Sequence, residues 1–142
     1  MENLRVIDVS EHQGTINWDA VKGHIDGAIL RCGYGDNIAS QDDKQWKRNA
    51  DECTRLGIPF GVYLYSYAKN SSDAKGEAQH VMRLVKDYKM AYPVYYDLED
   101  EMFKSLSESD NENIRKYIST SMPPIITQLI HAPLDCVPCA FN

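Results

Sequence analysis

The chain has 142 residues, of which 43% are hydrophobic and 25% charged, and its formal net charge is −6. This length and composition are typical of one globular domain with a single substantial core. The negative charge argues against binding to nucleic acid, which requires clustered Lys and Arg, and gives no support for docking on an anionic membrane. No apolar run approaches the roughly 18 residues of a membrane-spanning helix.

Strand patterns alternate with helix patterns along most of the sequence. The expected strands cover residues 4–10, 27–35, 59–68 and 93–99. Four helices are expected. The first is short and is capped by Asn17, and the second covers residues 42–56 and ends at Gly57. The third begins at Ser72 or Asp73 and runs to Val85, and the fourth covers residues 110–119. Strands that alternate with helices in units of about 30 residues predict a parallel α/β sheet with crossover helices.

The pattern of the units leaves open whether the sheet is open or closed into a barrel. A nucleotide-binding sheet is disfavoured, because Gly33-Tyr34-Gly35 lacks the third glycine and the helix start of a dinucleotide site. The start of the chain has no basic region followed by an apolar stretch, so no secretory signal peptide is expected.

The expected strand from residue 93 ends in two carboxylates. Because side chains alternate along a strand, Tyr95, Asp97 and Glu99 share one face. Asp97 and Glu99 would lie roughly 6.5 to 7 Å apart at the backbone, taking about 3.3 Å per residue. Repulsion and partial burial should raise the pKa of at least one of them, as general acid catalysis at a glycosidic bond requires. The alternative is a strand that simply ends in solvent.

Charged residues also interrupt two of the other strand patterns. Asp8 lies near the end of the first strand and Arg31 within the second. In α/β architectures the site gathers at the carboxyl ends of the strands, where Asp8, Asp97 and Glu99 would meet. Arg31 has two interpretations: an ion pair that holds Asp8 or Asp97, or a contact with the substrate.

The third strand pattern carries tyrosines at alternating positions, Tyr63, Tyr65 and Tyr67. The simplest interpretation is core packing with one hydroxyl hydrogen-bonded. Sugar rings also stack on exposed aromatic faces, so tyrosines beside paired acids favour a carbohydrate substrate.

The cysteines do not form a disulfide framework. Cys32 and Cys53 lie in strand and helix patterns, where buried free thiols are expected. Cys136 and Cys139 form a CxxC close to the C-terminus, without the strand and helix that accompany a redox motif. His131 would add one metal ligand, one short of a closed zinc site. No metal site is therefore expected.

Several segments together resemble family 25 of the glycoside hydrolases, the Chalaropsis-type lysozymes of bacteria and phage endolysins. Residues 8–14, DVSEHQG, are similar to the DVSxHQG opening of that family, and residues 95–99, YYDLE, to its D-x-E strand. Further similar segments, in the family's order and spacing, are INW at 16–18, AILRCGYG at 28–35 and GVYLYSYA at 61–68.

The resemblance implies N-acetylmuramidase activity, which cleaves the β-1,4 bond between N-acetylmuramic acid and N-acetylglucosamine in peptidoglycan. It implies that Glu99 donates the proton to the leaving oxygen and that Asp97 orients the substrate's N-acetyl group or steers water. Asp8 would shape and charge the floor of the site. Whether the anomeric configuration is retained or inverted stays open, although acids two apart on a strand suit substrate assistance.

By the same resemblance, Arg31, Tyr63 and Tyr65 would line the substrate cleft, and neither a metal nor an organic cofactor is expected. The expected partners are the glycan strands of peptidoglycan, with no nucleic acid and no membrane. The chain would act on the cell wall, either outside the cell or after release from the cytoplasm by a phage-type route.

The resemblance ends near residue 119. We expect residues 1–119 to form the first four βα units of a TIM-like (β/α) barrel, truncated after the D-x-E strand, and residues 120–142 an irregular tail. Four such strands would leave a parallel edge unpaired and able to recruit a second copy of the chain. We therefore expect the chain to be weakly active or inactive alone, or to need a partner chain that closes the sheet. The alternative function is a catalytically incompetent remnant that binds peptidoglycan.

Overall fold

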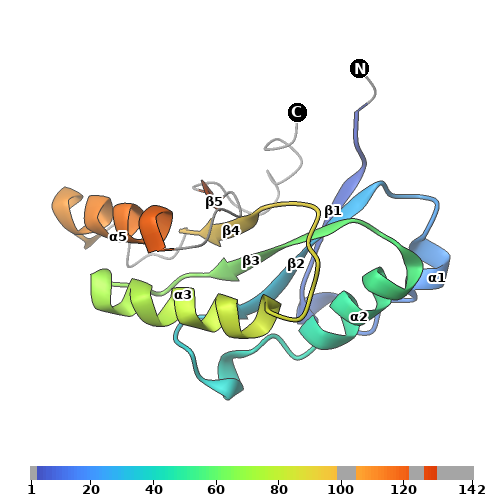
Figure 1. Cartoon of the computed structure of the whole chain (residues 1–142), viewed down its shortest axis with the longest axis horizontal. Helices are drawn as coiled ribbons and strands as arrows, with labels where there is room; N and C mark the ends of the chain where they lie inside the picture. Colours follow the sequence, from blue (N-terminus) through green and yellow to red (C-terminus); the bar gives the residue numbers. More distant parts are fainter. Residues whose placement is uncertain (1–2, 99–104, 122–126, 131–142) are drawn as a thin grey trace.

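Alternating strands and helices build one parallel sheet with helices packed on it (Figure 1). The computed structural model describes residues 3–98, 105–121 and 127–130. The strands are β1 (Val6–Val9), β2 (Gly27–Tyr34), β3 (Phe60–Tyr65), β4 (Val94–Asp97) and β5 (Thr127–Ile130). The α-helices are α1 (Trp18–Val21), α2 (Trp46–Leu56), α3 (Ser71–Val85) and α5 (Glu108–Ser121), and the short 3₁₀ helices are η1 (Glu11–Gln13) and η2 (Ala39–Gln41).

The strand order within the described sheet is β1-β2-β3-β4-β5, and every neighbouring pair is parallel. Each described strand therefore pairs with the next one along the chain, and each crossover between them contains an α-helix. Consecutive parallel strands in this order are the arrangement found in part of a (β/α) barrel, and the expected fold class is confirmed.

One element differs from the sequence-based expectation. The tail after residue 119 was expected to be irregular, whereas Thr127–Ile130 forms β5 and pairs with β4 over its whole length. Parallel pairing with β5 supplies hydrogen-bond partners to the edge of β4. The sequence does not predict β5, because a segment of four residues after two prolines carries no clear strand pattern of its own. The edge of β4 that we expected to be unpaired is therefore covered.

The helix boundaries follow from their caps. The Asn17 side chain accepts a hydrogen bond from the Ala20 N–H at 3.2 Å and begins α1, as expected. Gly57 ends α2 with φ +67°, a left-handed conformation that glycine adopts without strain. Helix α2 begins only at Trp46, later than predicted, because the acids at 42 and 43 bind other groups instead of continuing a helix.

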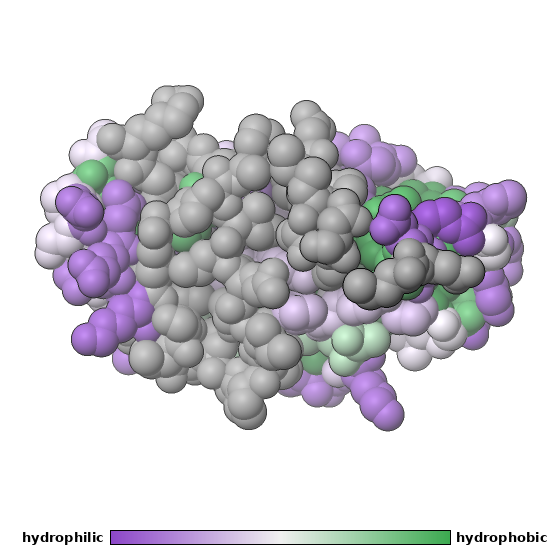
Figure 2. All heavy atoms as spheres, turned by 90° about the horizontal axis from the view of Figure 1, so that it is seen from above, coloured by the Kyte–Doolittle hydropathy of each residue, from purple (hydrophilic) through white to green (hydrophobic). Residues whose placement is uncertain are grey.

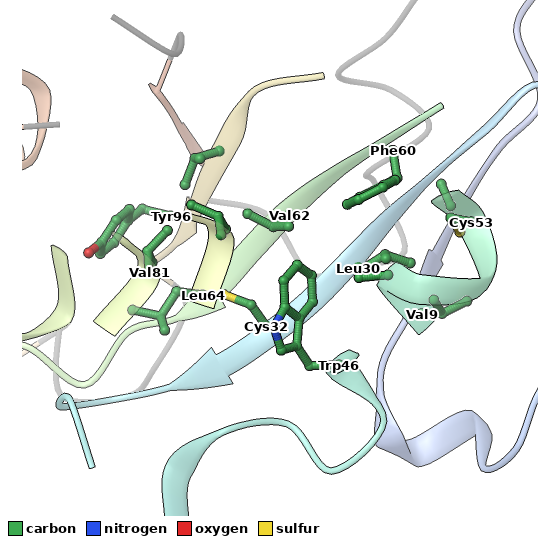
Figure 3. Close-up of a cluster of buried hydrophobic side chains, with 14 of the residues drawn as sticks. Val9, Leu30, Cys32, Trp46, Cys53, Phe60, Val62, Leu64, Val81 and Tyr96 are labelled. Carbon is green, nitrogen blue, oxygen red and sulfur yellow. The ribbon is translucent and has the colours of Figure 1, made fainter. Parts of the chain in front are cut away.

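The main hydrophobic core lies between the sheet and the helices. Alternate residues of β1 to β4 meet apolar side chains of the helices, and Figure 3 shows how the two sets face each other. The labelled members are Val9, Leu30, Cys32, Phe60, Val62, Leu64 and Tyr96 from the strands and Trp46, Cys53 and Val81 from the helices. Ile114 of α5 is fully buried in the same cluster, which anchors the last described helix.

The opposite face of the sheet carries a second, smaller apolar cluster. Ile29, Tyr63 and Tyr95 are buried there, with Val6 and Tyr92 packed against them. These strand positions alternate with those of the main core, as the two-residue period of a strand requires. Both faces of the central strands are therefore buried, as in other parallel sheets.

The predictions for the cysteines are confirmed where the structure describes them. Cys32 and Cys53 are buried free thiols, and burial raises the pKa of each to about 12. The Cys32 Sγ donates to the Tyr63 carbonyl at 3.4 Å. Residues 131, 136 and 139 lie outside the described residues.

Seen from above, hydrophilic side chains gather at both ends of the long axis, and hydrophobic ones show beside them at one end (Figure 2). None of the helices in the described part of the chain combines the length and the apolar character that a membrane span requires.

Candidate active site

The carboxyl ends of β1 to β4 bring together the residues that the sequence singled out. Asp8 lies in β1, Arg31 in β2, Tyr63 and Tyr65 in β3, and Asp97 is the last residue of β4. Arg31 pairs in register with Tyr63, and Tyr65 pairs with Asp97. Glu99, the expected proton donor, lies outside the described residues, two positions beyond the end of β4.

The hydroxyl of Tyr63 interacts with two acids of the site, Asp8 and Asp97. Its side chain is 2% exposed, and burial raises the pKa of its hydroxyl. The next cause of that raised pKa is the charge of Asp8, whose carboxylate also accepts a hydrogen bond from the hydroxyl, and the charge of Asp97 adds to it. The hydroxyl of Tyr63 is therefore a hydrogen-bond donor that remains protonated, close to carboxylates from two different strands.

Asp97 is fully buried at the end of β4. Its carbonyl oxygen accepts a hydrogen bond from the Ser66 N–H at 3.0 Å, just beyond the end of β3. The backbone of Asp97 is thus tied to the turn after β3. This hydrogen bond fixes the end of β4 relative to that turn.

Arg31 is held by two acids, Glu11 and Asp43. Its Nε lies 2.8 Å from Asp43 Oδ2, and its Nη2 lies 3.2 Å from Glu11 Oε1. The Glu11 N–H donates to Asp43 Oδ2 at 2.9 Å, so the three residues form one network. A backbone hydrogen bond from the Lys44 N–H at 2.9 Å is the main reason why the pKa of Glu11 is lowered.

A β-bulge explains why Tyr34 was missed as a site residue. The register between β2 and β3 shifts between Arg31 and Gly33, so that one extra residue lies on β2. Strict alternation would place Tyr34 on the opposite face from Arg31, but after the bulge the Arg31 Cζ lies 5.5 Å from the centre of the Tyr34 ring. The neighbouring glycines at 33 and 35 were the signal for such an irregularity.

Two hollows open beside these residues. The first, of about 470 Å³, is lined by Glu11, His12, Arg31, Tyr34, Tyr65 and Tyr67. The second, of about 430 Å³, is lined by Tyr34, Gly35, Asp36, Gln41, Tyr67, Lys69, Asp73 and Glu77. Both hollows share Tyr34 and Tyr67, and each combines aromatic rings with charged groups, as sugar-binding surfaces do.

The tyrosine ladder expected on one face of β3 is only partly regular. Tyr63 is buried, Tyr65 is half-buried, and β3 ends before the exposed Tyr67. The ring of Tyr67 nevertheless lies 5.1 Å from that of Tyr65 and 6.3 Å from that of Tyr34. Tyr34 and Tyr67 line both hollows, and Tyr65 lines the first.

Within the described residues, no group of three or more His, Cys, Asp and Glu side chains is arranged to hold a metal ion. The chemistry that the described side chains offer is acid–base chemistry by carboxylates, together with aromatic and guanidinium contacts to a polar ligand.

A parallel β/α sheet with acids and tyrosines at the carboxyl ends of its strands defines a domain of the (β/α)-barrel class. The sequence model of the family described as glycosyl hydrolases family 25 matches residues 7–125. The chain belongs to this family, and the resemblance seen in its motifs is confirmed. No curated protein matches the chain significantly in sequence.

Several solved structures share the fold. The modular autolysin LytC from Streptococcus pneumoniae is 34% identical, with a TM-score of 0.76 over 89% of this chain and 32% of LytC. The catalytic domain of endolysin ply40 from bacteriophage P40 of Listeria monocytogenes is 18% identical, with a TM-score of 0.73 over 90% of this chain and 63% of that domain.

The Streptococcus pneumoniae protein GHIP, described as a glycosyl hydrolase 25, is 22% identical, with a TM-score of 0.74 over 99% of this chain and 64% of GHIP. The chain therefore spans about a third of LytC and just under two thirds of the other two structures.

Proposed function

We propose that the chain is a peptidoglycan hydrolase of the N-acetylmuramidase type, which cleaves the β-1,4 bond between N-acetylmuramic acid and N-acetylglucosamine. The observation that carries this proposal is the family match over residues 7–125. LytC, the solved relative with 34% identity, was also solved in complex with a synthetic peptidoglycan ligand. The acids and tyrosines at the carboxyl ends of β1, β3 and β4 support a polar, carbohydrate-like substrate.

In this proposal Glu99 is the general acid. It gives its proton to the glycosidic oxygen as the bond to the anomeric carbon breaks, so that the leaving sugar departs as a neutral alcohol. Asp97, two residues earlier, orients the N-acetyl group of the substrate or steers the attacking water. A carboxylate at Asp97 also stabilises the positive charge that develops on the sugar ring.

Asp8, Tyr63 and Arg31 are proposed to shape the charge of the site. The Tyr63 hydroxyl donates a hydrogen bond to the Asp8 carboxylate and so holds that group in position. Arg31 lies beside the first hollow and, because Asp43 and Glu11 already hold its position, it can meet a substrate oxygen without losing side-chain freedom on binding.

Tyr65 is proposed as a direct substrate contact. It is half-buried and lines the first hollow, so that its ring presents a face to a bound sugar. The substrate-binding role first assigned to Tyr63 is better described as indirect, because its ring is buried among Ile29 and Tyr95.

The test is the hydrolysis of purified bacterial cell walls by the wild-type chain, by Glu99→Gln and by Glu112→Gln. Glu112 is an exposed glutamate on α5, so its replacement controls for the loss of one negative charge. We expect the wild type and Glu112→Gln to lower wall turbidity and release reducing sugar, and Glu99→Gln to lose this activity by at least about 10²-fold.

Equal activity of wild type and Glu99→Gln would remove Glu99 from the mechanism. Wall binding by the wild type without any release of reducing sugar would instead favour the alternative function, a peptidoglycan-binding remnant. The anomer formed first, read by NMR, distinguishes substrate assistance with retention from direct attack of water with inversion.

Two further points belong to the proposal. The site of action is the cell wall, reached by a route that involves either secretion or phage-type release. Self-association would use a sheet edge, and among the described strands the edges are β1 and β5. Light scattering across a hundredfold range of protein concentration tests this, and a constant monomer mass would exclude it.

A further inference from the structure

Glu77 is a buried acid that the proposed mechanism does not use. It lies on α3, is 1% exposed, and both of its carboxylate oxygens bind the turn that follows β3. Oε1 accepts from the Ser66 hydroxyl at 2.5 Å and Oε2 accepts from the Tyr67 N–H at 2.8 Å. Two charge-assisted hydrogen bonds from neighbouring residues fix the turn in both position and orientation.

The same turn is connected to the acidic end of β4. The Ser66 hydroxyl oxygen accepts from the Ala68 N–H at 3.2 Å, while the Ser66 N–H donates to the Asp97 carbonyl at 3.0 Å. Glu77 is therefore one residue removed from the backbone of Asp97. A shift of the turn would therefore move the backbone of Asp97 at the end of β4.

Tyr67 is the side chain that this turn presents. It is 44% exposed, lines both hollows, and stands beside the rings of Tyr65 and Tyr34. It lies beyond the end of β3, so the pairing of the sheet does not set its position. An aromatic ring can act as a stacking platform for a sugar only when its backbone is held in place.

Burial of the Glu77 carboxylate costs free energy, because the charged group loses contact with water. Burial raises the pKa of Glu77 to about 7, against the lowering effect of the two hydrogen bonds. The charges of Asp73 on α3 and of Asp36 on the loop after β2 also raise it, and Lys69 lines the same hollow. An apolar residue would avoid this cost, which indicates that the acceptor oxygens themselves are needed.

We propose that Glu77 is a positioning residue for the glycan site: its carboxylate fixes the turn at residues 66–68 so that Tyr67 serves as a platform between the two hollows. The inference rests on the proposed function for the identity of the ligand, a polymer of N-acetylated amino sugars. Glu77 itself touches neither the substrate nor the reacting atoms.

The test measures binding separately from hydrolysis. All variants are made in a Glu99→Gln background, and their Kd for soluble, purified peptidoglycan glycan strands is measured by calorimetry. We expect Glu77→Ala to raise the Kd about tenfold, as for the loss of a charge-assisted hydrogen bond. Glu77→Gln, which keeps an acceptor oxygen, should restore part of the affinity, and Glu112→Ala should change nothing.

A double-mutant cycle then asks whether Glu77 acts through Tyr67. We expect Tyr67→Ala to weaken binding about as much as Glu77→Ala does, and the combined variant to be no weaker than either one. Losses that multiply in the combined variant, or a Kd unchanged by Glu77→Ala, would overturn the inference. So would a wild-type site that binds no glycan.

An amide-resolved NMR titration provides a readout that does not involve the ligand. The Tyr67 N–H resonance should move as the pH passes through about 7 in the parent chain and stay in place in Glu77→Gln. A Tyr67 N–H chemical shift that changes neither with pH nor with the substitution would overturn the inference. Failure of the proposed function shows separately, as a wild-type chain that binds glycan but releases no reducing sugar.

Discussion

The guanidinium of Arg31 is anchored to the Asp43 carboxylate, with 2.8 Å between Nε and Oδ2, and the Asp43 side chain is fully buried. Asp43 lies just before α2, and it also accepts from the Glu11 N–H and the Gln45 N–H, both at 2.9 Å. One acid thus joins the loop after β1, strand β2 and the start of α2 around the edge of the first hollow.

Replacement of Asp43 by alanine should therefore be strongly destabilising. Of its two carboxylate partners identified in the described part of the chain, a mostly buried guanidinium keeps Glu11, and two backbone N–H groups lose their acceptor. We therefore expect a loss of about 3 kcal/mol in the free energy of unfolding. Urea denaturation measures it. Asp19→Ala removes an exposed ion pair with Arg55 and should change the free energy of unfolding far less than Asp43→Ala does. Similar losses in both variants would contradict the role of Asp43.

Glu77 should make stability depend on pH. The pKa of Glu77 in the folded chain is about 7, above its ordinary value of 4.5, so between these two values the folded state binds more protons than the unfolded state. Its stabilising contribution is therefore complete below pH 4.5 and is lost as the pH rises through 7, by about 3 kcal/mol in total.

Glu77→Gln should lack this contribution. Between pH 4.5 and pH 8 the wild type should lose stability relative to Glu77→Gln. Denaturation at several pH values measures the unfolding free energies of both proteins. Glu112→Gln serves as the exposed control. A difference that stays constant with pH would show that Glu77 titrates at its ordinary value.

Gly61 should not tolerate a methyl group. A Cβ at this position of β3 would lie 2.7 Å from the Pro93 carbonyl oxygen and 2.8 Å from the Tyr92 Cβ, and the backbone oxygen cannot move aside easily. We expect Gly61→Ala to cost about 2 to 3 kcal/mol. Gly57→Ala, at a site with open space but φ +67°, should cost only about 1 kcal/mol. Thermal unfolding of the two variants should therefore rank them in that order, and the reverse order would contradict the close approach at Gly61.

Tyr63→Phe should affect activity more than stability. It removes the hydroxyl that donates to Asp8 and leaves the packed ring in place, so we expect the rate of wall hydrolysis to fall about tenfold and the stability to change by about 1 kcal/mol. Tyr88→Phe is the matched control, because the Tyr88 hydroxyl also donates to an aspartate, Asp51, at 2.6 Å but on the helical side. Equal activity of Tyr63→Phe and Tyr88→Phe would contradict the assigned role of Tyr63.

Much of this fold could be predicted from local patterns. Gly57 and Asn17 mark helix boundaries through backbone conformation and side-chain capping, which depend on the neighbouring sequence alone. The placement of Asp8 and Asp97 near strand ends on one face follows from the two-residue period and from the rule that parallel strands share a carboxyl edge.

What could not be predicted depends on contacts between distant segments. The bulge that returns Tyr34 to the face of Arg31 requires knowledge of the register with β3. Asp43 and Glu77 lie in patterns typical of ordinary helix starts and solvated helix faces, and only tertiary packing buries them. Strand β5 depends on the edge of β4, which no local pattern within Thr127–Ile130 contains.

The most direct test of the central claim is the identity of the sugar at the newly formed reducing end. Purified peptidoglycan is digested with the wild-type chain, the products are reduced with borohydride, and the resulting sugar alcohols are analysed by mass spectrometry. A muramidase generates N-acetylmuramitol, and this is the product we predict, with none formed by Glu99→Gln. N-acetylglucosaminitol as the main product, or the same yield of N-acetylmuramitol from Glu99→Gln, would contradict the account.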